Sequence, residues 1–223
     1  MNEKERIVHS WSGGKDSSIA LYRVISLGTY EPVRLLTTAT YDYKRVSMHG
    51  VRLELAFMQA KSIGIPLDVV YISKNATNEE YESKMREILT KYKEDGISKV
   101  SFGDIFLEDI KKYRETKMAE RGMSCIFPIW GRDTKQLAHE IIKLGFKGII
   151  CTVDSRKLGK EFAGRMYDLE LLKSLPKDVD PCGENGEFHT FIFDGPIFKK
   201  SIAVKKGETI LRDSFYFTDI LPV

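Results

Sequence analysis

Short apolar runs alternate with amphipathic stretches along the first 150 residues of the chain. Runs of about four to eight apolar or β-branched residues between turn residues are typical of strands, whereas apolar residues that recur every three or four positions are typical of helices. The expected strands cover residues 6–11, 32–40, 67–72, 97–103, 124–128 and 146–153. The expected helices cover residues 16–27, 47–63, 108–121 and 134–144, with one more between Thr77 and Gly96.

Capping and turn residues mark several helix ends. Gly28 is placed as a C-cap, and Gly64 is a stop signal after the second helix. Thr77 and Glu80 have the spacing of a capping box. Strands and helices that alternate regularly, with short connections, predict an α/β fold with a doubly wound parallel sheet. In such a sheet the chemistry lies at the carboxyl ends of the strands.

The pattern changes after Asp154. A helix is expected over residues 165–175, followed by an acidic, glycine-bearing loop over 183–187. Strands are then expected over residues 188–193, 198–205 and 208–217, with a hairpin turn at Lys206–Gly207. This change of pattern predicts a nucleotide-type domain over residues 1–128 and a smaller α+β acceptor domain over residues 129–223.

Composition narrows the class of protein. The 223 residues carry 35 basic and 32 acidic side chains, a net charge of +3, and 42% are hydrophobic. These values exclude collagen-like and disordered chains and give no electrostatic case for bulk nucleic-acid binding. Three widely spaced cysteines argue against a disulfide framework or a zinc site. With neither a signal peptide nor a membrane-spanning run expected, the sequence predicts a soluble cytoplasmic protein without membrane partners, and it leaves a monomer or a homo-oligomer open.

The sharpest motif is Ser12-Gly13-Gly14-Lys15-Asp16-Ser17, which follows the first expected strand and opens a helix. The two glycines let the backbone turn tightly and approach a ligand. Amides of the first helical turn, with the helix dipole, favour an anion there. Lys15 adds a point charge for phosphate, and Asp16 beside a phosphate suggests a Mg²⁺ ion between them.

This motif is neither a Walker A loop nor a dinucleotide fingerprint. It resembles the PP-loop of the ATP pyrophosphatase superfamily, whose SGGxDS pattern it matches completely. The resemblance implies an adenine nucleotide alpha hydrolase-like, HUP-type fold. It also implies cleavage of ATP between the α- and β-phosphates, with adenylation of a substrate oxygen.

A second stretch, residues 180–190 with the sequence DPCGENGEFHT, resembles the GEGGEFET signature of the diphthine–ammonia ligase family. Residues 47–49, 102–104 and 128–133 also fit that family, so the resemblance extends from about residue 6 to 205. It implies a ligase that adenylates an acceptor carboxylate and amidates it with ammonium, the acceptor being the diphthine side chain on elongation factor 2. Asn185 and His189 depart from the family pattern, which has Gly and Glu there.

Together these signals give three sets of candidate residues. Candidate catalytic residues are Lys15, Asp16, Glu184, Glu187 and His189. Candidate nucleotide-binding residues are Ser12, Gly13, Gly14, Lys15, Asp16, Ser17, Thr37, His49, Gly103 and Asp104, and Asp16 is the candidate Mg²⁺ ligand. Candidate substrate-binding residues are Arg132, Arg165, Gly183, Asn185, Gly186 and Thr190.

Plainer explanations stay open for several of these residues. Glu184 and Glu187 fit a solvated acidic loop, His189 fits a packed strand histidine, and Asp104 fits a helix N-cap. Three other functions also stay open. The first is the same adenylation chemistry on a different small-molecule, protein or RNA acceptor. The second is non-catalytic binding of ATP or AMP, and the third is sulfur transfer through Cys151 and Cys182.

Overall fold

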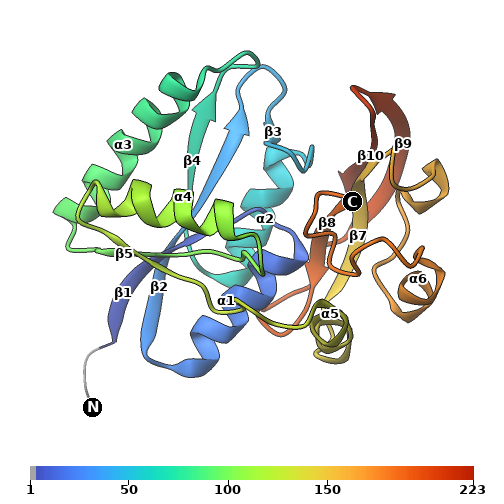
Figure 1. The fold of residues 1–223 in the computed structure, drawn as a ribbon, viewed down its shortest axis with the longest axis horizontal. Helices are drawn as coiled ribbons and strands as arrows, with labels where there is room; N and C mark the ends of the chain where they lie inside the picture. The colour runs from blue at the N-terminus through green and yellow to red at the C-terminus, as the bar shows by residue number, and fades with distance from the viewer. Residues whose placement is uncertain (1–3) are drawn as a thin grey trace.

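A computed structural model describes residues 4–223 and contains two separate β-sheets. The larger one, sheet A, has the order β4-β2-β1-β5-β6, with every neighbouring pair parallel. The short strand β3 pairs antiparallel with the end of β2. The strands of sheet A are β1 (Glu5–Ser10), β2 (Tyr30–Thr40), β3 (Arg45–Val46), β4 (Leu67–Ile72), β5 (Lys99–Ser101) and β6 (Ser124–Ile126). Sheet A confirms the predicted doubly wound parallel sheet (Figure 1).

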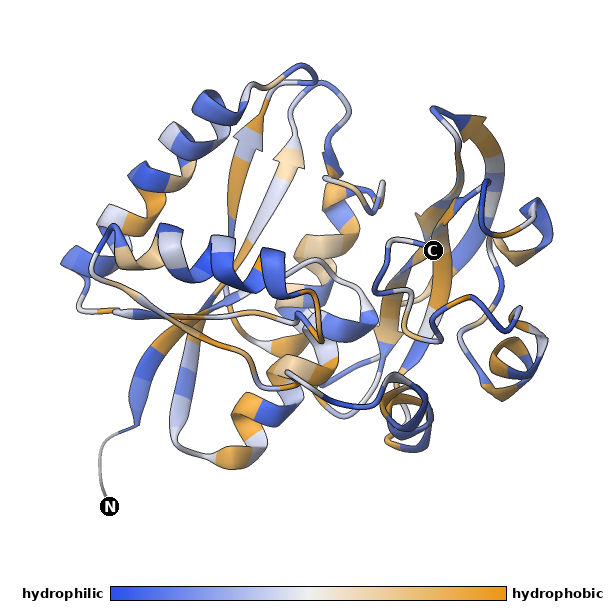
Figure 2. Cartoon of the chain, in the orientation of Figure 1, coloured by the Kyte–Doolittle hydropathy of each residue, from blue (hydrophilic) through white to orange (hydrophobic). Residues whose placement is uncertain are grey.

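Helices cover both faces of sheet A. On one face α3 and α4 bury side chains such as Leu89 and Met118 against Val8 and Val100. Figure 2 shows α3 with its hydrophilic residues on the outer side. On the other face lie α1 and α2, which also contact the second sheet. The helices are α1 (Lys15–Leu27), α2 (Leu53–Ile63), α3 (Asn78–Glu94), α4 (Glu108–Ala119), α5 (Thr134–Lys143), α6 (Leu169–Ser174) and the 3₁₀ turn η1 (Lys160–Phe162).

The second sheet, sheet B, is antiparallel and has the order β8-β7-β10-β9. Successive side chains of a strand point to opposite faces, and an irregularity between Ile150 and Thr152 shifts this alternation, so β7 contributes to two cores. Ile150 and Val153 belong to the core shared by α1, α5 and α6, whereas Ile149 and Cys151 belong to the core over α2. The strands are β7 (Lys147–Asp154), β8 (Phe188–Asp194), β9 (Val204–Arg212) and β10 (Phe215–Pro222). The helices α1 and α2 therefore join the two sheets.

Two predictions about the sequence before the acidic loop are wrong. The helix expected over residues 47–63 begins only at Leu53, because Met48 and Gly50 have φ angles of 64° and 65°, which a right-handed helix does not allow. The strand expected over residues 146–153 exists as β7, but it pairs antiparallel in sheet B rather than extending the parallel sheet. Strand pairing depends on residues far away in sequence, which a local pattern does not reveal.

Two predictions about the later chain also need correction. The helix expected over residues 165–175 begins at Leu169, where the Asp168 side chain accepts a hydrogen bond from the Leu171 amide. The expected turn at Lys206–Gly207 lies inside β9, and the hairpin turns instead at Asp213 and Ser214, whose φ angles are 48° and 67°. Residues 198–203, expected to be a strand, lie before β9.

The predicted cap of α3 is confirmed in part. The Thr77 hydroxyl accepts a hydrogen bond from the Glu80 amide at 3.1 Å, as a capping box requires. The Glu80 carboxylate, however, accepts from the amide and hydroxyl of Ser73 instead of returning to Thr77. Across residues 4–223, no helix has the length and apolar character needed to span a membrane.

A buried glutamine on α2 ties the loop after β1 to sheet B. The Gln59 side-chain amide donates to the carbonyl oxygens of Gly13, at 2.9 Å, and of Ile192 in β8, at 2.6 Å. Its oxygen accepts a hydrogen bond from the Trp11 indole at 3.1 Å. Ile192 also donates its own amide to the Gly13 carbonyl oxygen at 2.9 Å. Gln59 is fully buried, so these bonds are made without competition from water.

We predict that Gln59→Leu lowers the free energy of unfolding by about 2–4 kcal/mol, because it leaves several buried polar groups without partners. Chemical denaturation measures this change. The matched control is Gln136→Leu, which makes the same replacement at an exposed position on α5 and is expected to change stability by less than about 0.5 kcal/mol. Equal losses in the two variants would contradict the role given to Gln59.

Candidate functional site

The loop between β1 and α1 forms the floor of the candidate site. Gly13 has a φ of 78°, and a side chain there would meet Gln59 at 2.5 Å, so both the turn and the packing require glycine. The Ser12 and Ser17 hydroxyls lie 3.1 Å apart, and Ser17 donates to the Gly14 carbonyl oxygen. These bonds hold the first turn of α1 open toward the carboxyl ends of β1 and β5. That is the switch point at which doubly wound sheets bind ligands.

A cavity of about 550 Å³ lies above this loop. Segments far apart in sequence meet around it: the β1–α1 loop, the end of β2, residues 46–49, the end of β5 and the acidic loop before β8. Gly103 allows the close approach of β5, because a side chain there would lie 2.8 Å from the backbone of Asp16. The predicted site residues that line it are Ser12, Asp16, Ser17, Thr37, His49, Gly103, Asp104, Gly183, Glu184 and His189.

Lys15 and Asp16 form an ion pair at the start of α1, with 2.8 Å between Nζ and Oδ2. The Lys15 side chain is only 2% exposed, and its ammonium group lies over the rings of Phe188 and Tyr167. Burial is the largest influence and lowers the pKa of Lys15, but the charge and hydrogen bond of Asp16, together with Cys182 and Glu184, raise it overall, so the group stays charged. Lys15 therefore places its charge beneath the loop rather than in the cavity.

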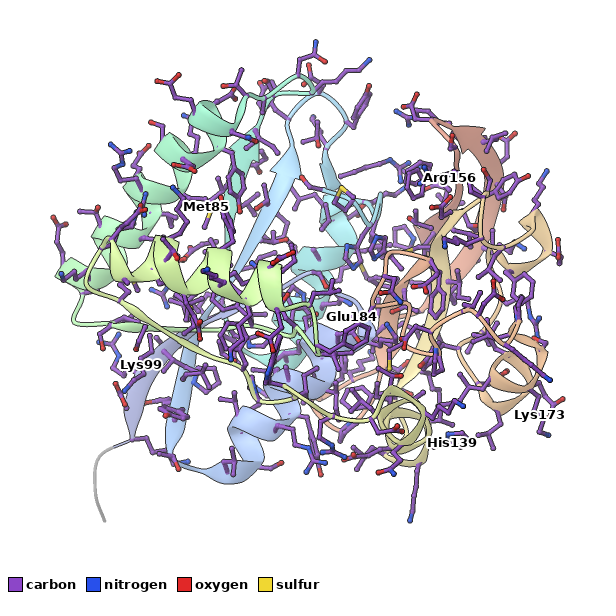
Figure 3. All side chains as sticks on the ribbon, viewed as in Figure 1. Met85, Lys99, His139, Arg156, Lys173 and Glu184 are labelled. Atoms are coloured by element: carbon purple, nitrogen blue, oxygen red, sulfur yellow. The ribbon has the colours of Figure 1, made fainter. Side chains whose placement is uncertain are left out.

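The two glutamates of the acidic loop have different surroundings. Glu184 faces the cavity, where its Oε1 accepts from the Ile105 amide at 2.8 Å. Figure 3 shows Glu184 near the centre of the molecule, between the two sheets. Glu187 is 2% exposed and does not line the cavity; its Oε1 accepts from the Asp180 amide and the Asn185 side chain, each at 3.2 Å. In this structure Glu187 stabilises the loop that carries Glu184.

Burial changes the acidity of the groups in the cavity. It raises the pKa of Glu184 to about 7, and the charge of Asp16 adds to the effect, whereas the Ile105 amide opposes it. Burial, together with the charge of Lys15, lowers the pKa of His189 to about 4. The ring of His49 lies 4.5 Å from that of His189, and burial and this neighbour hold its pKa well below the usual range. Both histidines are therefore neutral near pH 7.

The remaining predicted residues lie outside the cavity. Thr190 is buried, and its hydroxyl accepts from the Lys15 amide at 3.0 Å, which positions the loop. Arg132 forms an ion pair with Glu140 of α5, and Arg165 donates to the Ser174 hydroxyl beside α6. Neither arginine lines the cavity, so the structure does not bring them to the other candidates. Gly13, Gly14, Asn185 and Gly186 shape the two loops without lining it.

Sequence reasoning missed two residues that support the site. Arg114 of α4 lines the cavity, lies 2.7 Å from the Asp104 carboxylate and stacks 4.5 Å from the centre of the Phe102 ring. The basic character of this helix was visible in the sequence, but its partner was not. Gln59 could not be identified from the sequence, because a single polar residue on an apolar helix face belongs to no recognisable motif. Both residues make contacts between segments that are distant in sequence, and sequence reasoning does not reveal such contacts.

The cysteines do not support sulfur transfer. Cys151 and Cys182 are buried and free, and their sulfur atoms contact different carbonyl oxygens, those of His189 and Thr134. Burial raises the pKa of Cys151 to about 12 and raises that of Cys182 as well. Because the thiolate is the reactive form, thiols of this kind are poor nucleophiles.

A Mg²⁺ ion would find suitable donors in this cavity. The Oδ1 atom of Asp16 is buried and accepts no hydrogen bond from the described residues, and Glu184 faces the same space. Carboxylate oxygens, in small number and completed by phosphate and water, are the ligands that Mg²⁺ prefers. Among residues 4–223, no group of three or more His, Cys, Asp or Glu side chains is arranged to hold a metal ion.

Comparison with known protein families matches both halves of the chain to domain models. Residues 5–125 match the model of the diphthamide synthase N-terminal domain, and residues 133–221 match that of the C-terminal domain. The diphthine–ammonia ligase of Rattus norvegicus is 29% identical, covering 96% of this chain and 88% of that protein. The diphthine–ammonia ligase of Schizosaccharomyces pombe is 27% identical over 91% of this chain, which spans only 36% of that protein.

Two solved structures are similar to part of this chain. A predicted subunit of tRNA methyltransferase from Methanocaldococcus jannaschii is 20% identical with a TM-score of 0.45, over 65% of this chain and 80% of that one. The U34-tRNA thiolase NcsA from Methanococcus maripaludis is 16% identical with a TM-score of 0.39, over 65% of this chain and 59% of that one. At this level of similarity neither structure bears on function.

The raised pKa of Glu184 predicts how stability depends on pH. Its ordinary value is 4.5, so between about pH 4.5 and 7 the folded chain binds more protons at this group than the unfolded chain. Raising the pH through this range therefore lowers the stability that Glu184 contributes. We expect the difference in unfolding free energy, wild type minus Glu184→Gln, to fall by about 1 kcal/mol between about pH 5 and 8, after allowance for solvent screening. Denaturation at several pH values measures it, and a flat or rising difference would contradict the assignment.

Proposed function

The chain belongs to the diphthamide synthase family, and from that premise we propose that it is an ATP-dependent ligase that turns an acceptor carboxylate into an amide. Ammonium supplies the nitrogen, and ATP is converted to AMP and pyrophosphate. The names of the relatives, diphthine–ammonia ligases, support diphthine as the acceptor, and we propose that elongation factor 2 carries it. In this proposal residues 1–128 hold ATP, and residues 129–223 supply the acceptor side.

One observation carries the proposal: a single cavity joins the first turn of α1 to the acidic loop. The amides at the start of α1 favour the phosphates of ATP. Within the described residues, the Gly14 and Lys15 amides donate to Ser12 and Thr190, whereas those of Asp16 and Ser17 donate to no backbone carbonyl oxygen. The buried charge of Lys15 lies just below and adds to the positive potential. A site of this kind suits a polyphosphate next to a proton acceptor.

The first step forms an acyl-adenylate. An oxygen of the acceptor carboxylate attacks the α-phosphorus of ATP, the bond to the bridging oxygen of the β-phosphate breaks, and pyrophosphate leaves with the bonding electrons. Fixed amide dipoles at the start of α1 stabilise the charge that gathers on the leaving group. The Ser12 and Ser17 hydroxyls face the same cavity, and each would exchange its present hydrogen bond for one to a phosphate oxygen. Mg²⁺, when bound at Asp16, would neutralise phosphate charge.

The second step forms the amide. The nitrogen of ammonia attacks the acyl carbon, the bond to the AMP oxygen breaks, and AMP leaves. Ammonium must lose a proton to attack, and the attacking nitrogen must lose another as the amide forms. Glu184 suits this task because a carboxylate with a pKa of about 7 is partly ionised at neutral pH and binds a proton well. The neutral ring of His189 in the same cavity can accept a hydrogen bond.

We predict that the protein, incubated with ATP, Mg²⁺, ammonium and diphthine-bearing elongation factor 2, releases one AMP and one pyrophosphate for each amide formed. The factor is purified from cells that lack their own ligase. Nucleotides are separated by chromatography, and the amide is detected by mass spectrometry of the factor. ADP and phosphate in place of AMP would contradict the proposed chemistry.

Two variants give this assay its controls. Glu184→Gln keeps the oxygen that accepts from Ile105, so ATP affinity should stay within about twofold while amidation slows by roughly 10²–10⁴-fold, as expected for loss of a general base. Glu170→Gln removes an exposed carboxylate on α6 that contacts only Lys173 and should leave the rate unchanged. If Glu184→Gln amidates as fast as Glu170→Gln, Glu184 is not the proton acceptor.

A further inference from the structure

A second cavity, of about 460 Å³, lies between residues 40–50 and the β9–β10 hairpin. Figure 1 shows the β9–β10 hairpin on the side of the molecule that faces β3. We propose that this cavity, called here the hairpin pocket, binds the side chain that carries the acceptor carboxylate. The inference rests on the proposed function and names the place from which its second substrate enters.

The hairpin pocket is contiguous with the cavity above the Ser12–Ser17 loop. The two share four lining residues, Val46, Ser47, Met48 and His189. A group that lies in the hairpin pocket and extends past His189 therefore enters the space next to the candidate phosphate site. An adenylation needs this arrangement, because the attacking carboxylate and the α-phosphorus must come within contact distance.

The size and lining of the pocket suit one side chain rather than a second nucleotide. Its volume lies in the range of about 300–1,000 Å³ that is typical of small-molecule sites. Alternate residues of β9, namely Glu208, Ile210 and Arg212, face it, as the two-residue period of a strand requires. Rings supplied by Tyr43, Phe215 and Phe217 complete an apolar body with polar groups around it.

The charged residues of the hairpin pocket favour a ligand that carries a single carboxylate. The Arg212 guanidinium lies 4.9 Å from the centre of the Tyr43 ring and 5.8 Å from that of Phe217, and it has no carboxylate partner within residues 4–223. Arg45, by contrast, already pairs with Asp219 at 3.0 Å. The two rings flank the Arg212 guanidinium, whose planar fork suits the recognition of a carboxylate.

Two acidic groups argue against a polyanion in the same place. Glu208 and Asp213 line the pocket and form no ion pair with any cation in the described chain. They repel a triphosphate more strongly than a side chain with one negative charge, which the Arg212 cation can balance. Tyr43 and Met48 are 39% and 70% exposed, so the pocket is open to a side chain presented by another protein.

The test uses the intact protein with ATP and diphthine-bearing elongation factor 2. Arg212→Gln removes the carboxylate partner and should raise the KM for the factor by roughly ten- to a hundredfold, because a charge-assisted hydrogen bond is lost. Ile210→Trp fills the pocket and should have an effect at least as large. Matched controls on the same strand are Lys205→Gln and Leu211→Trp, which do not line the pocket and should leave the KM within about twofold. The affinity for ATP should be unchanged in all four variants.

The KM values of the variants and the amidation by the wild-type protein separate a failure of the hairpin pocket from a failure of the proposed function. Raised KM values in Arg212→Gln and Ile210→Trp, with both controls normal, support the hairpin pocket. A wild-type protein that amidates the factor together with normal KM values in both pocket variants would overturn the pocket and leave the proposed function intact. A wild-type protein that binds ATP but amidates no diphthine-bearing factor would overturn the proposed function, and with it the inference that rests on it.

Discussion

The carbonyl oxygen of Gly13 accepts hydrogen bonds from two different elements of the fold, and the arrangement of the rest of the site depends on these two bonds. The Ile192 amide of β8 and the Gln59 side chain of α2 both donate to it at 2.9 Å. One atom of the loop after β1 is therefore held by sheet B and by helix α2. Without these bonds a buried carbonyl would be unsatisfied, which is costly enough to fix the position of β8 against the loop.

The chemistry follows from that position. Once β8 is fixed, His189 lies at the edge of the cavity and Thr190 holds the Lys15 amide. The loop before β8 then brings Glu184 to the Ile105 amide, next to the carboxyl end of β5. The same sheet continues to the β9–β10 hairpin, which forms one wall of the hairpin pocket. Sheet B thus places the proposed proton acceptor and the proposed acceptor pocket around the candidate phosphate site at the carboxyl ends of sheet A.

The sequence was most informative where structure is local. The Ser12–Ser17 loop could be predicted because two glycines between an apolar strand and an amphipathic helix determine a turn by themselves. The antiparallel place of β7 and the turn at Asp213 could not, because they depend on strand pairing between distant segments. Glu184 and Glu187 looked alike in sequence, yet tertiary packing buries one and leaves the other at the cavity. The division of the chain after residue 128 stays a prediction.

The central claim is that an acceptor carboxylate attacks the α-phosphorus of ATP. Labelling the acceptor carboxylate with ¹⁸O tests it directly, because the attacking oxygen stays on phosphorus when the amide forms. The account predicts one ¹⁸O atom in each AMP released during amidation and none in pyrophosphate, as read by mass spectrometry of the nucleotides. Label in inorganic phosphate, with ADP as the other product, would show attack at the γ-phosphorus and contradict it.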